Sequence, residues 1–352
     1  MQTTPKAPAA QRSGPMLSRV AHSLYWMSLY IERAENVARL LDVNLQFLLD
    51  FQGLSESLPQ EHWGSILASS GGAELFAELH GEPDSQNVPE FLAFDQRNPN
   101  SILSCVLSAR ENARMIRDQI SSEMWEVINE LYLFLRARNA AEVWRAGPYE
   151  FFQQVKRYSH QFQGLADSTY PRSEGWDFIQ FGKLIERADK TTRILDVKYH
   201  ILLPTATDVG GAVDTAQWHA VLRSASALDA YRRYYVHEIL PWKVADFLIF
   251  SDTFPRSLCY CVGRLDGYLH RILGDSPARP RAPAAVAAHD LLADLKSRDI
   301  EYVLQMGLHE FLIEVQKSLD RIGDEVVQTT MFFPADPEPE EHQHQQTQQQ
   351  QQ

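Results

Sequence analysis

The chain has 352 residues, of which 44% are hydrophobic, and this apolar content is enough to bury a sizeable core. Its formal net charge of −13 at pH 7 argues against duplex nucleic acid or an anionic membrane surface as the main partner, because both favour a basic face. Its three cysteines form no CxxC pair and no disulfide framework, which favours buried thiols in a reducing cytoplasm.

The two ends of the chain are poor in apolar residues. Residues 1–15 are polar and contain prolines, and residues 334–352 are acidic and then rich in glutamine. We therefore expect both segments to be disordered. Residues 16–333 form the predicted folded domain, and none of its windows reaches the roughly 18 uninterrupted apolar residues that a membrane helix needs.

The first predicted helix covers residues 17–51, and Ser18 is suited to cap its N-terminus. Apolar residues recur at alternating steps of three and four from Leu24 to Leu48, which is the spacing of one helix face. More apolar residues lie beside this face, so we expect the helix in the centre of a bundle. One narrow polar stripe remains, formed by Glu32, Glu35, Arg39 and Asp42.

A second stretch of the chain repeats the first one. Ile31–Leu49 reads IERAENVARLLDVNLQFLL, and Ile185–Leu203 reads IERADKTTRILDVKYHILL. The polar stripe returns as Glu186, Asp189, Arg193 and Asp196. Further matches extend in the same order along the folded region, so the sequence predicts two tandem repeats over about residues 17–169 and 174–331.

Each repeat should contain about five helices. In the first repeat we expect the later ones, and a short element, at residues 60–80, 88–95, 99–120, 122–140 and 147–169. Residues 275–288 contain three prolines and should form a loop. No segment shows the alternation of a β-strand, so the predicted fold is an all-α helical bundle whose two long opening helices pack near the centre.

The polar stripes are the most suggestive chemical feature, because a Gly-rich phosphate loop, a GxSxG elbow and an HExxH motif are all absent from the sequence. Carboxylates on facing bundle helices often build di-metal sites, but Glu35 and Asp189 replace the histidine of the usual Glu-x-x-His pair. We assign no metal ligand. The alternative is a network between the helices in which arginines neutralise the carboxylates. Its members would be Arg33, Arg39, Arg187 and Arg193.

The helix expected at 99–120 carries a second candidate site. Arg110, Arg114 and Arg117 share one face of it with Ser121, whereas the second repeat has Asp266, His270 and Leu273 at the positions of the arginines. The fold therefore does not require these arginines. They could bind a carboxylate, a phosphate or an acidic peptide, or they could pair with the carboxylates of the first helix.

Two stretches, MLSRVAHSLYWMSLYIERAENVARLLDVN and ARENARMIRDQISSEMWEVIN, resemble the bacterial alpha-E domain family. The resemblance covers about residues 16–333 and implies an all-helical fold. It also implies a setting, because these proteins are typically encoded beside, or fused to, circularly permuted ATP-grasp proteins and transglutaminase-like cysteine peptidases. Ser28 and Leu29 depart from the pattern, where Gly and a basic residue are expected. The residues carried over by motif are Glu32, Arg33, Glu35, Asn36, Arg39, Asp42, Arg110, Glu111, Asn112, Arg114, Arg117, Glu123 and Trp125.

Three functional hypotheses follow from these residues and this resemblance. The leading one is an accessory helical protein of a peptide-modifying or amide-ligating system, which has no cofactor of its own and meets ATP and Mg²⁺ only through an ATP-grasp partner. The second is an enzyme that uses Glu32 or Glu35 as acid or base and the three arginines to hold an anionic substrate. The third is a sensor of a metal or a small molecule.

Overall fold

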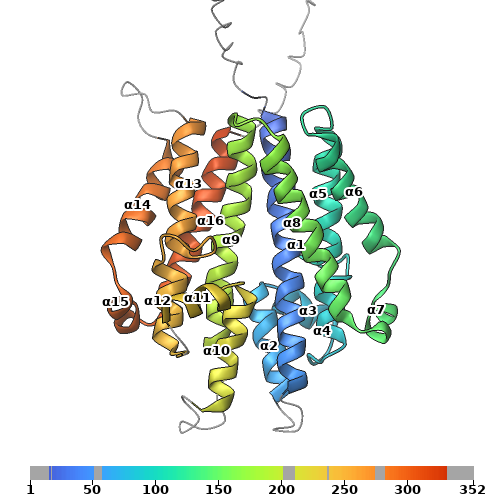
Figure 1. Ribbon diagram of the computed structural model, residues 1–352, viewed down its shortest axis with the longest axis vertical. Coiled ribbons are helices and arrows are strands. Elements are labelled where there is room, and N and C mark those ends of the chain that lie inside the picture. Colours follow the sequence, from blue (N-terminus) through green and yellow to red (C-terminus); the bar gives the residue numbers. More distant parts are fainter. Residues whose placement is uncertain are drawn as a thin grey trace, which may run out of the picture.

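All regular structure in the described part of the chain is α-helical. The computed structural model describes residues 16, 18–50, 58–200, 211–235, 238–273 and 282–330, which form sixteen helices and no strand (Figure 1). The predicted all-α class is confirmed. The segments 1–15 and 334–352, which we expect to be disordered, lie outside the described residues.

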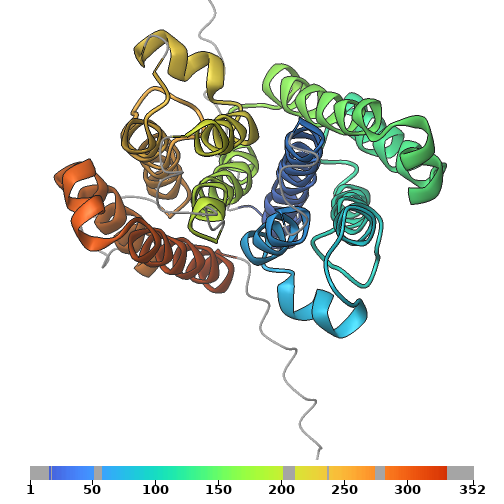
Figure 2. The same ribbon diagram turned by 90° about the horizontal axis from the view of Figure 1, so that it is seen from below.

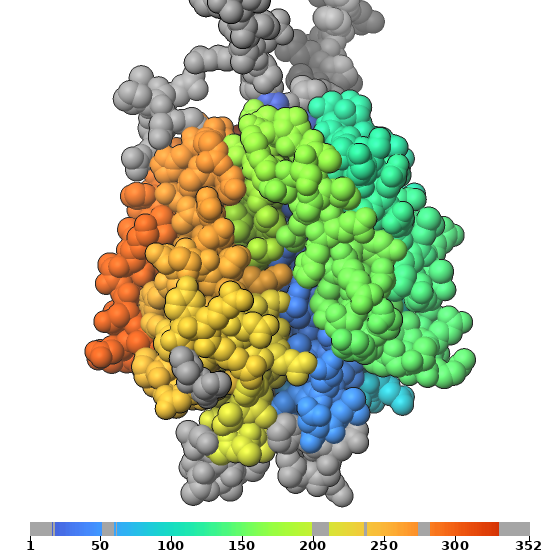
Figure 3. Space-filling view, viewed as in Figure 1, coloured from blue at the N-terminus to red at the C-terminus, as the bar shows by residue number. Residues whose placement is uncertain are grey.

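Two long helices, α1 (Ser18–Asp50) and α9 (Glu174–His200), pack against each other along the middle of the molecule, as the apolar stripes predict (Figures 1 and 2). Their apolar faces supply fully buried side chains such as Leu24, Leu41 and Phe181. On the face drawn in Figure 3, the surface of α1 shows as a narrow strip between the two halves. A charged residue on the inner side of either helix therefore needs a partner from the other helix or from the helices that cover them.

The upper contact between the two long helices depends on one glycine. A β-carbon at Gly182 of α9 would overlap the backbone carbonyl oxygen of Tyr25 on α1. The helix backbones can approach this closely only because glycine has no side chain.

The surrounding helices follow the same order in the two halves. Helices α5 (Ile102–Met115) and α8 (Pro148–Thr169) cover α1, and helices α13 (Leu258–Leu273) and α16 (Leu308–Thr330) cover α9. The second helix of each half crosses over to the long helix of the other half. The helices that cross are α2 (Leu58–Ser70), which packs on α9, and α10 (Ala212–Ser224), which packs on α1. The two tandem repeats stay a prediction from the sequence.

Shorter helices complete each half, which brings the number of described helices to eight per half instead of the expected five or so. The undercount has a physical reason, since helices of one or two turns show too few periodic positions to be recognised. Six of these shorter helices have seven to ten residues. They are α3 (Ala73–Leu79), α4 (Asn87–Ala93), α7 (Ala140–Ala146), α11 (Leu228–Tyr235), α12 (Pro241–Phe250) and α15 (Ile300–Met306). The outermost pair, α6 (Ser122–Arg136) and α14 (Pro283–Ser297), packs on α5 and α13.

Several predicted boundaries are wrong. The helix expected at 60–80 is interrupted at residues 71 and 72, and the helix expected at 122–140 ends at Arg136. The expected loop at 275–288 ends early, because α14 starts at Pro283, where a proline in the first turn favours a helix start instead of preventing it. Residues 275–281 lie outside the described residues. The helix expected at 99–120 ends at Met115, and Ser121 is the N-cap of α6, its hydroxyl accepting from the Met124 backbone amide.

Candidate functional site

Two glutamate–arginine pairs join α1 and α9, one in each direction. Arg33 of α1 donates from Nε and Nη2 to the two carboxylate oxygens of Glu186, at 3.0 and 2.7 Å. Arg187 of α9 donates in the same way to the two oxygens of Glu32, at 2.8 and 3.0 Å. Each helix therefore contributes one acid and one base to a pair of forked bridges, the geometry in which a guanidinium holds a carboxylate best.

We call the buried group around the second bridge the Glu32 cluster, which consists of Glu32, Glu35, Arg187 and Arg256. Glu32 has no exposed surface, and it also lies 3.1 Å from Nη1 of Arg256, in the turn before α13. Gln163 of α8 donates to its Oε2 at 2.7 Å. Burial opposes ionisation of Glu32, but the charges of Arg187 and Arg256 outweigh this effect and hold the pKa of the carboxyl below its ordinary value.

Glu35 is equally buried and shares Arg256 with Glu32. Nη2 of Arg256 lies 2.8 Å from Oε2 of Glu35, and Arg39 pairs with Oε1 from one turn along α1. Burial again works against the charge, but Arg256 and Arg39 keep the pKa of the Glu35 carboxyl well below its usual range. Both glutamates are therefore carboxylates at neutral pH, and neither reaches solvent.

Asp42, the last carboxylate of the α1 stripe, has partners of its own. It accepts from Nζ of Lys156 on α8 at 2.7 Å, and from Gln153 and Gln46 at 3.1 Å each. Lys156 is itself only 8% exposed. This third pair ties α1 to α8, so each carboxylate of the α1 stripe pairs with a residue outside α1.

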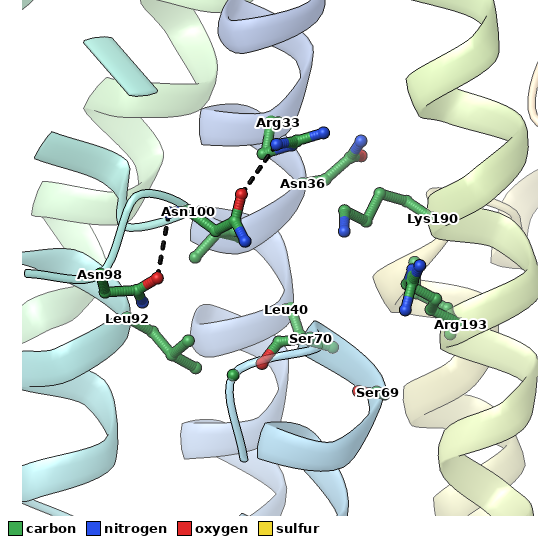
Figure 4. A pocket seen from close by; sticks show the side chains of 13 residues that line it. Arg33, Asn36, Leu40, Ser69, Ser70, Leu92, Asn98, Asn100, Lys190 and Arg193 are labelled. Atoms are coloured by element: carbon green, nitrogen blue, oxygen red, sulfur yellow. Dashed lines mark hydrogen bonds between the residues drawn. The ribbon is translucent and has the colours of Figure 1, made fainter. Parts of the chain in front are cut away.

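We call the group around the other bridge the Glu186 cluster, which consists of Glu186, Arg33, Asn100 and Lys190. Here Asn100, in the turn before α5, takes the place that Arg256 has before α13, and its Oδ1 accepts from Nη1 of Arg33 at 2.7 Å. The shorter amide leaves a cavity of about 20 Å³ between α1, α9 and the end of α2. Figure 4 shows Asn36 and Lys190 extending into this pocket from the two long helices.

The architecture and the two bridges can now be compared with known proteins. A sequence model of the Alpha-E family, described as a predicted alpha-helical domain with a conserved ER motif, matches residues 16–332. The chain belongs to the Alpha-E family. The ER dipeptide occurs twice in it, as Glu32–Arg33 and as Glu186–Arg187, and these four residues form the two bridges.

Curated relatives of this Alpha-E chain include uncharacterized proteins of Mycobacterium bovis and Mycobacterium tuberculosis. Both are 24% identical to it over 338 residues, which is 90% of this chain but only 37% of the relative. The chain therefore spans well under half the length of these proteins. No solved structure matches it.

The three arginines of the second candidate site do not reach the carboxylates of α1. Arg110 donates to Asn129 of α6 at 2.9 Å, and its guanidinium lies 4.5 Å from the ring centre of Tyr132. Arg117, in the turn after α5, lies 4.9 Å from the ring centre of Trp125. Their predicted pairing with Glu32, Glu35 and Asp42 is therefore wrong, because nearer arginines and a lysine already neutralise those carboxylates.

The remaining candidates from the second motif lie at the surface of α5 and α6. Arg114 pairs with Glu111 three residues earlier, at 2.7 Å, and both side chains are at least half exposed. Asn112 donates to the Ser108 carbonyl, and Glu123 is exposed in the first turn of α6. The structure thus divides the predicted site residues between a buried network and an exposed surface.

Sequence reasoning missed the partners that other elements bring to the polar stripes, namely Arg256, Asn100, Gln163, Lys156 and Lys190. One signal was available in the sequence. Asn100 and Arg256 are the middle residues of the aligned Pro-x-Ser segments that begin at Pro99 and Pro255. The difference between these two residues marks where the halves diverge.

The predicted free thiols are present, because all three cysteines are buried and unpaired. Within the described ranges, no group of three or more His, Cys, Asp or Glu side chains is arranged to hold a metal ion. Among the helices that the structure describes, none is both long and apolar enough to span a bilayer.

Proposed function

We propose that this Alpha-E protein is a non-catalytic accessory protein that binds a circularly permuted ATP-grasp ligase in a peptide-modifying or amide-forming system. The observation that carries this proposal is the state of Glu32 and Glu35, which arginines hold as carboxylates away from solvent. A general acid or base must reach its substrate and exchange protons near neutral pH. Neither glutamate meets these conditions, which supports a binding role over an enzymatic one.

The lengths of the relatives also support a role beside another protein. The curated relatives contain the Alpha-E region as 37% of a longer chain. A region that occurs within a longer polypeptide commonly acts together with the remainder of it. In the proposed system the ligase binds ATP and Mg²⁺, and a transglutaminase-like peptidase is the second partner.

The surface that we propose for docking is the arginine–aromatic surface, made of Arg110, Arg114, Arg117, Trp125 and Tyr132. Arg114 is 64% exposed on its side chain, and Arg117 is exposed as well. Arg110 and Arg117 flank the indole of Trp125 at 5.5 and 4.9 Å from its ring centre. Arginine and tryptophan are the residues on which protein interfaces most often depend for affinity. The matching segment of the second half lacks these arginines, so the fold does not need them.

Co-purification of the full chain with the ATP-grasp protein from the same genome tests the proposal. We expect a complex at about 10 μM of each protein, and its absence at that concentration would contradict the proposed function. We expect the Alpha-E protein to bind the ligase without itself binding ATP, since the nucleotide is expected on the ligase alone.

The position of the interface is tested by charge reversal. The double variant Arg114→Glu/Arg117→Glu should weaken the complex at least about tenfold, because it replaces two exposed cations at the centre of the surface. The matched control is Arg97→Glu/Arg157→Glu, which reverses two other arginines that are 58% and 61% exposed. Equal weakening by both variants would show a general charge effect and would contradict this docking surface.

A further inference from the structure

The pocket beside the Glu186 cluster is lined by hydrogen-bond donors from both long helices. Arg33 and Asn36 enter it from α1, Lys190 and Arg193 enter it from α9, and Asn100 closes one side (Figure 4). Its volume of about 20 Å³ exceeds the minimum for one water-sized group, which is about 10–15 Å³. The space therefore suits a small polar group that is bound through hydrogen bonds.

Asn36 carries an unsatisfied donor in this pocket. The residue is 2% exposed, and its Oδ1 accepts from Nη1 of Arg256 at 2.8 Å, which fixes the orientation of the amide. Its Nδ2 has no hydrogen-bond partner among the described residues. A buried donor without an acceptor is unfavourable, so a ligand with an acceptor here would recover part of the lost hydrogen-bond energy.

The charges around the pocket leave one cation poorly matched. Arg33 donates to Glu186, and Arg193 donates to Asp189, so both guanidiniums are paired. Nζ of Lys190 lies 3.8 Å from Glu186 and 3.5 Å from Asp189, both longer than the roughly 2.7–2.9 Å of a charge-assisted hydrogen bond. Of the three cations at the pocket, Lys190 therefore has the longest contacts with a carboxylate. Asp320 of α16 is a third acid near Arg193 and Lys190, and it lies at the surface.

The Glu32 cluster shows how this chain completes the same kind of site with its own residues. There the guanidinium of Arg256 fills the space between Glu32, Glu35 and Asn36. On the Glu186 side Asn100 is too short to do so. The hydroxyls of Ser69 and Ser70, at the end of α2, donate to carbonyls of their own helix. They are neutral and bring no negative charge to the pocket.

We propose that this pocket binds a small carboxylate, with Nδ2 of Asn36 and Nζ of Lys190 as its donors. One carboxylate supplies the acceptor that Nδ2 of Asn36 lacks, and it lets Nζ of Lys190 make a shorter hydrogen bond than its contacts with Glu186 and Asp189. The carboxylate comes either from a free acid or from the end of a peptide, which present the same group. This inference is independent of the proposed docking to a ligase, which uses another surface.

Thermal unfolding of the full chain with added ligand tests the inference. The probes are sodium acetate, an acetylated tripeptide with a free C-terminus and the same peptide as its C-terminal amide, with sodium chloride at equal ionic strength as the control. We expect acetate to raise the melting temperature with a millimolar Kd, as suits a ligand of four heavy atoms. Stabilisation by the free peptide and not by its amide, beyond that by acetate, identifies a chain end as the source. Equal stabilisation by chloride and acetate would overturn the inference.

Two variants assign the effect to this pocket. Asn36→Asp keeps the acceptor for Arg256 and replaces the unpaired donor with a negative oxygen, so acetate should bind at least about tenfold more weakly. Asn100→Arg supplies the longer side chain that Arg256 provides in the other cluster, and it should abolish the acetate effect while the protein stays folded. Lys243→Gln, which removes a cation paired with exposed Glu238, is the control and should bind acetate normally. Normal acetate binding by both pocket variants would overturn the assignment.

Discussion

The Glu32 cluster and the Glu186 cluster use the same dipeptide and differ in how they are completed. In each cluster, an arginine of one long helix donates two hydrogen bonds to a glutamate of the other. Arg256 closes the first with a third cation, whereas Asn100 offers only an amide to the second. The bridges therefore serve the packing of α1 on α9, and the residues from the flanking turns decide which side can take a ligand.

The comparison also explains why the ER motif alone does not identify a catalytic site. Buried ion pairs add little net stability compared with apolar packing, but removing one partner is costly because the other charge stays buried. Such pairs are suited to fix how two helices meet. Substitutions at Arg256, Gly182, Lys183 and Asn100 test this view.

Replacing Arg256 by methionine should have the largest effect. It leaves Glu32 and Glu35, both without exposed surface, short of a shared partner, so we expect a loss of about 3–5 kcal/mol in the free energy of unfolding. Urea denaturation at pH 7 measures it, with Arg97→Met as the exposed control. The loss should shrink as the pH falls below about 4.5, where unfolded glutamates take up protons and the wild type loses this contribution too. A loss below about 1 kcal/mol would mean that the cluster is not needed for packing.

Replacing Gly182 by alanine should be the next most damaging change. The new methyl group overlaps the Tyr25 carbonyl, which is backbone and cannot rotate away, so the two long helices must separate. We expect a loss of about 2–3 kcal/mol by the same measurement. The matched control is Gly164→Ala on α8, where a β-carbon meets no atom within 4 Å and should stabilise the helix by about 0.5–1 kcal/mol. Equal effects of the two substitutions would refute the close approach of α1 and α9.

Replacing Lys183 should increase the stability of the protein, whereas the substitutions at Arg256, Gly182 and Asn100 should decrease it. Burial, and then the charge of Arg187, lowers the pKa of Lys183 from 10.5 to about 8, whereas the matching position on α1 is the apolar Leu29. Below pH 8 the folded protein carries this unfavourable charge, and between pH 8 and 10.5 it releases the proton before the unfolded chain does. Lys183→Met should therefore stabilise the protein by about 2 kcal/mol at pH 7, and the gain should decline towards pH 10.5. A gain that does not vary with pH would assign it to packing instead of charge.

The long central helices and their charged stripes were predictable from the sequence, because their periodicity extends over many turns. The two stripes also predicted that arginines would neutralise their carboxylates, and Arg33, Arg39, Arg187 and Arg193 do so. The short helices were not predictable in the same way. Seven residues give at most two repeats of the helical period, and tertiary packing decides their structure.

The partners of the clusters could not be derived from local patterns. Arg256 contacts Glu35 across 221 residues of chain, a separation at which spacing carries no information. The pairing predicted between the arginines at 110, 114 and 117 and the carboxylates of α1 is wrong for a local reason. Trp125 and Tyr132 on the next helix lie nearer to them than any carboxylate of α1, and no glycine or proline marks the end of α5 at Met115.

The smallest effect is expected at Asn100, and it tests the comparison most directly. Asn100→Ala removes one hydrogen bond to Arg33, but both bonds from Arg33 to Glu186 remain, and no buried carboxylate loses its partner. Urea denaturation should show a loss of only about 0.5–1.5 kcal/mol, well below that of Arg256→Met. If the two losses were equal, Asn100 would close its cluster as firmly as Arg256 does. The difference between the two clusters would then not explain the pocket beside Glu186.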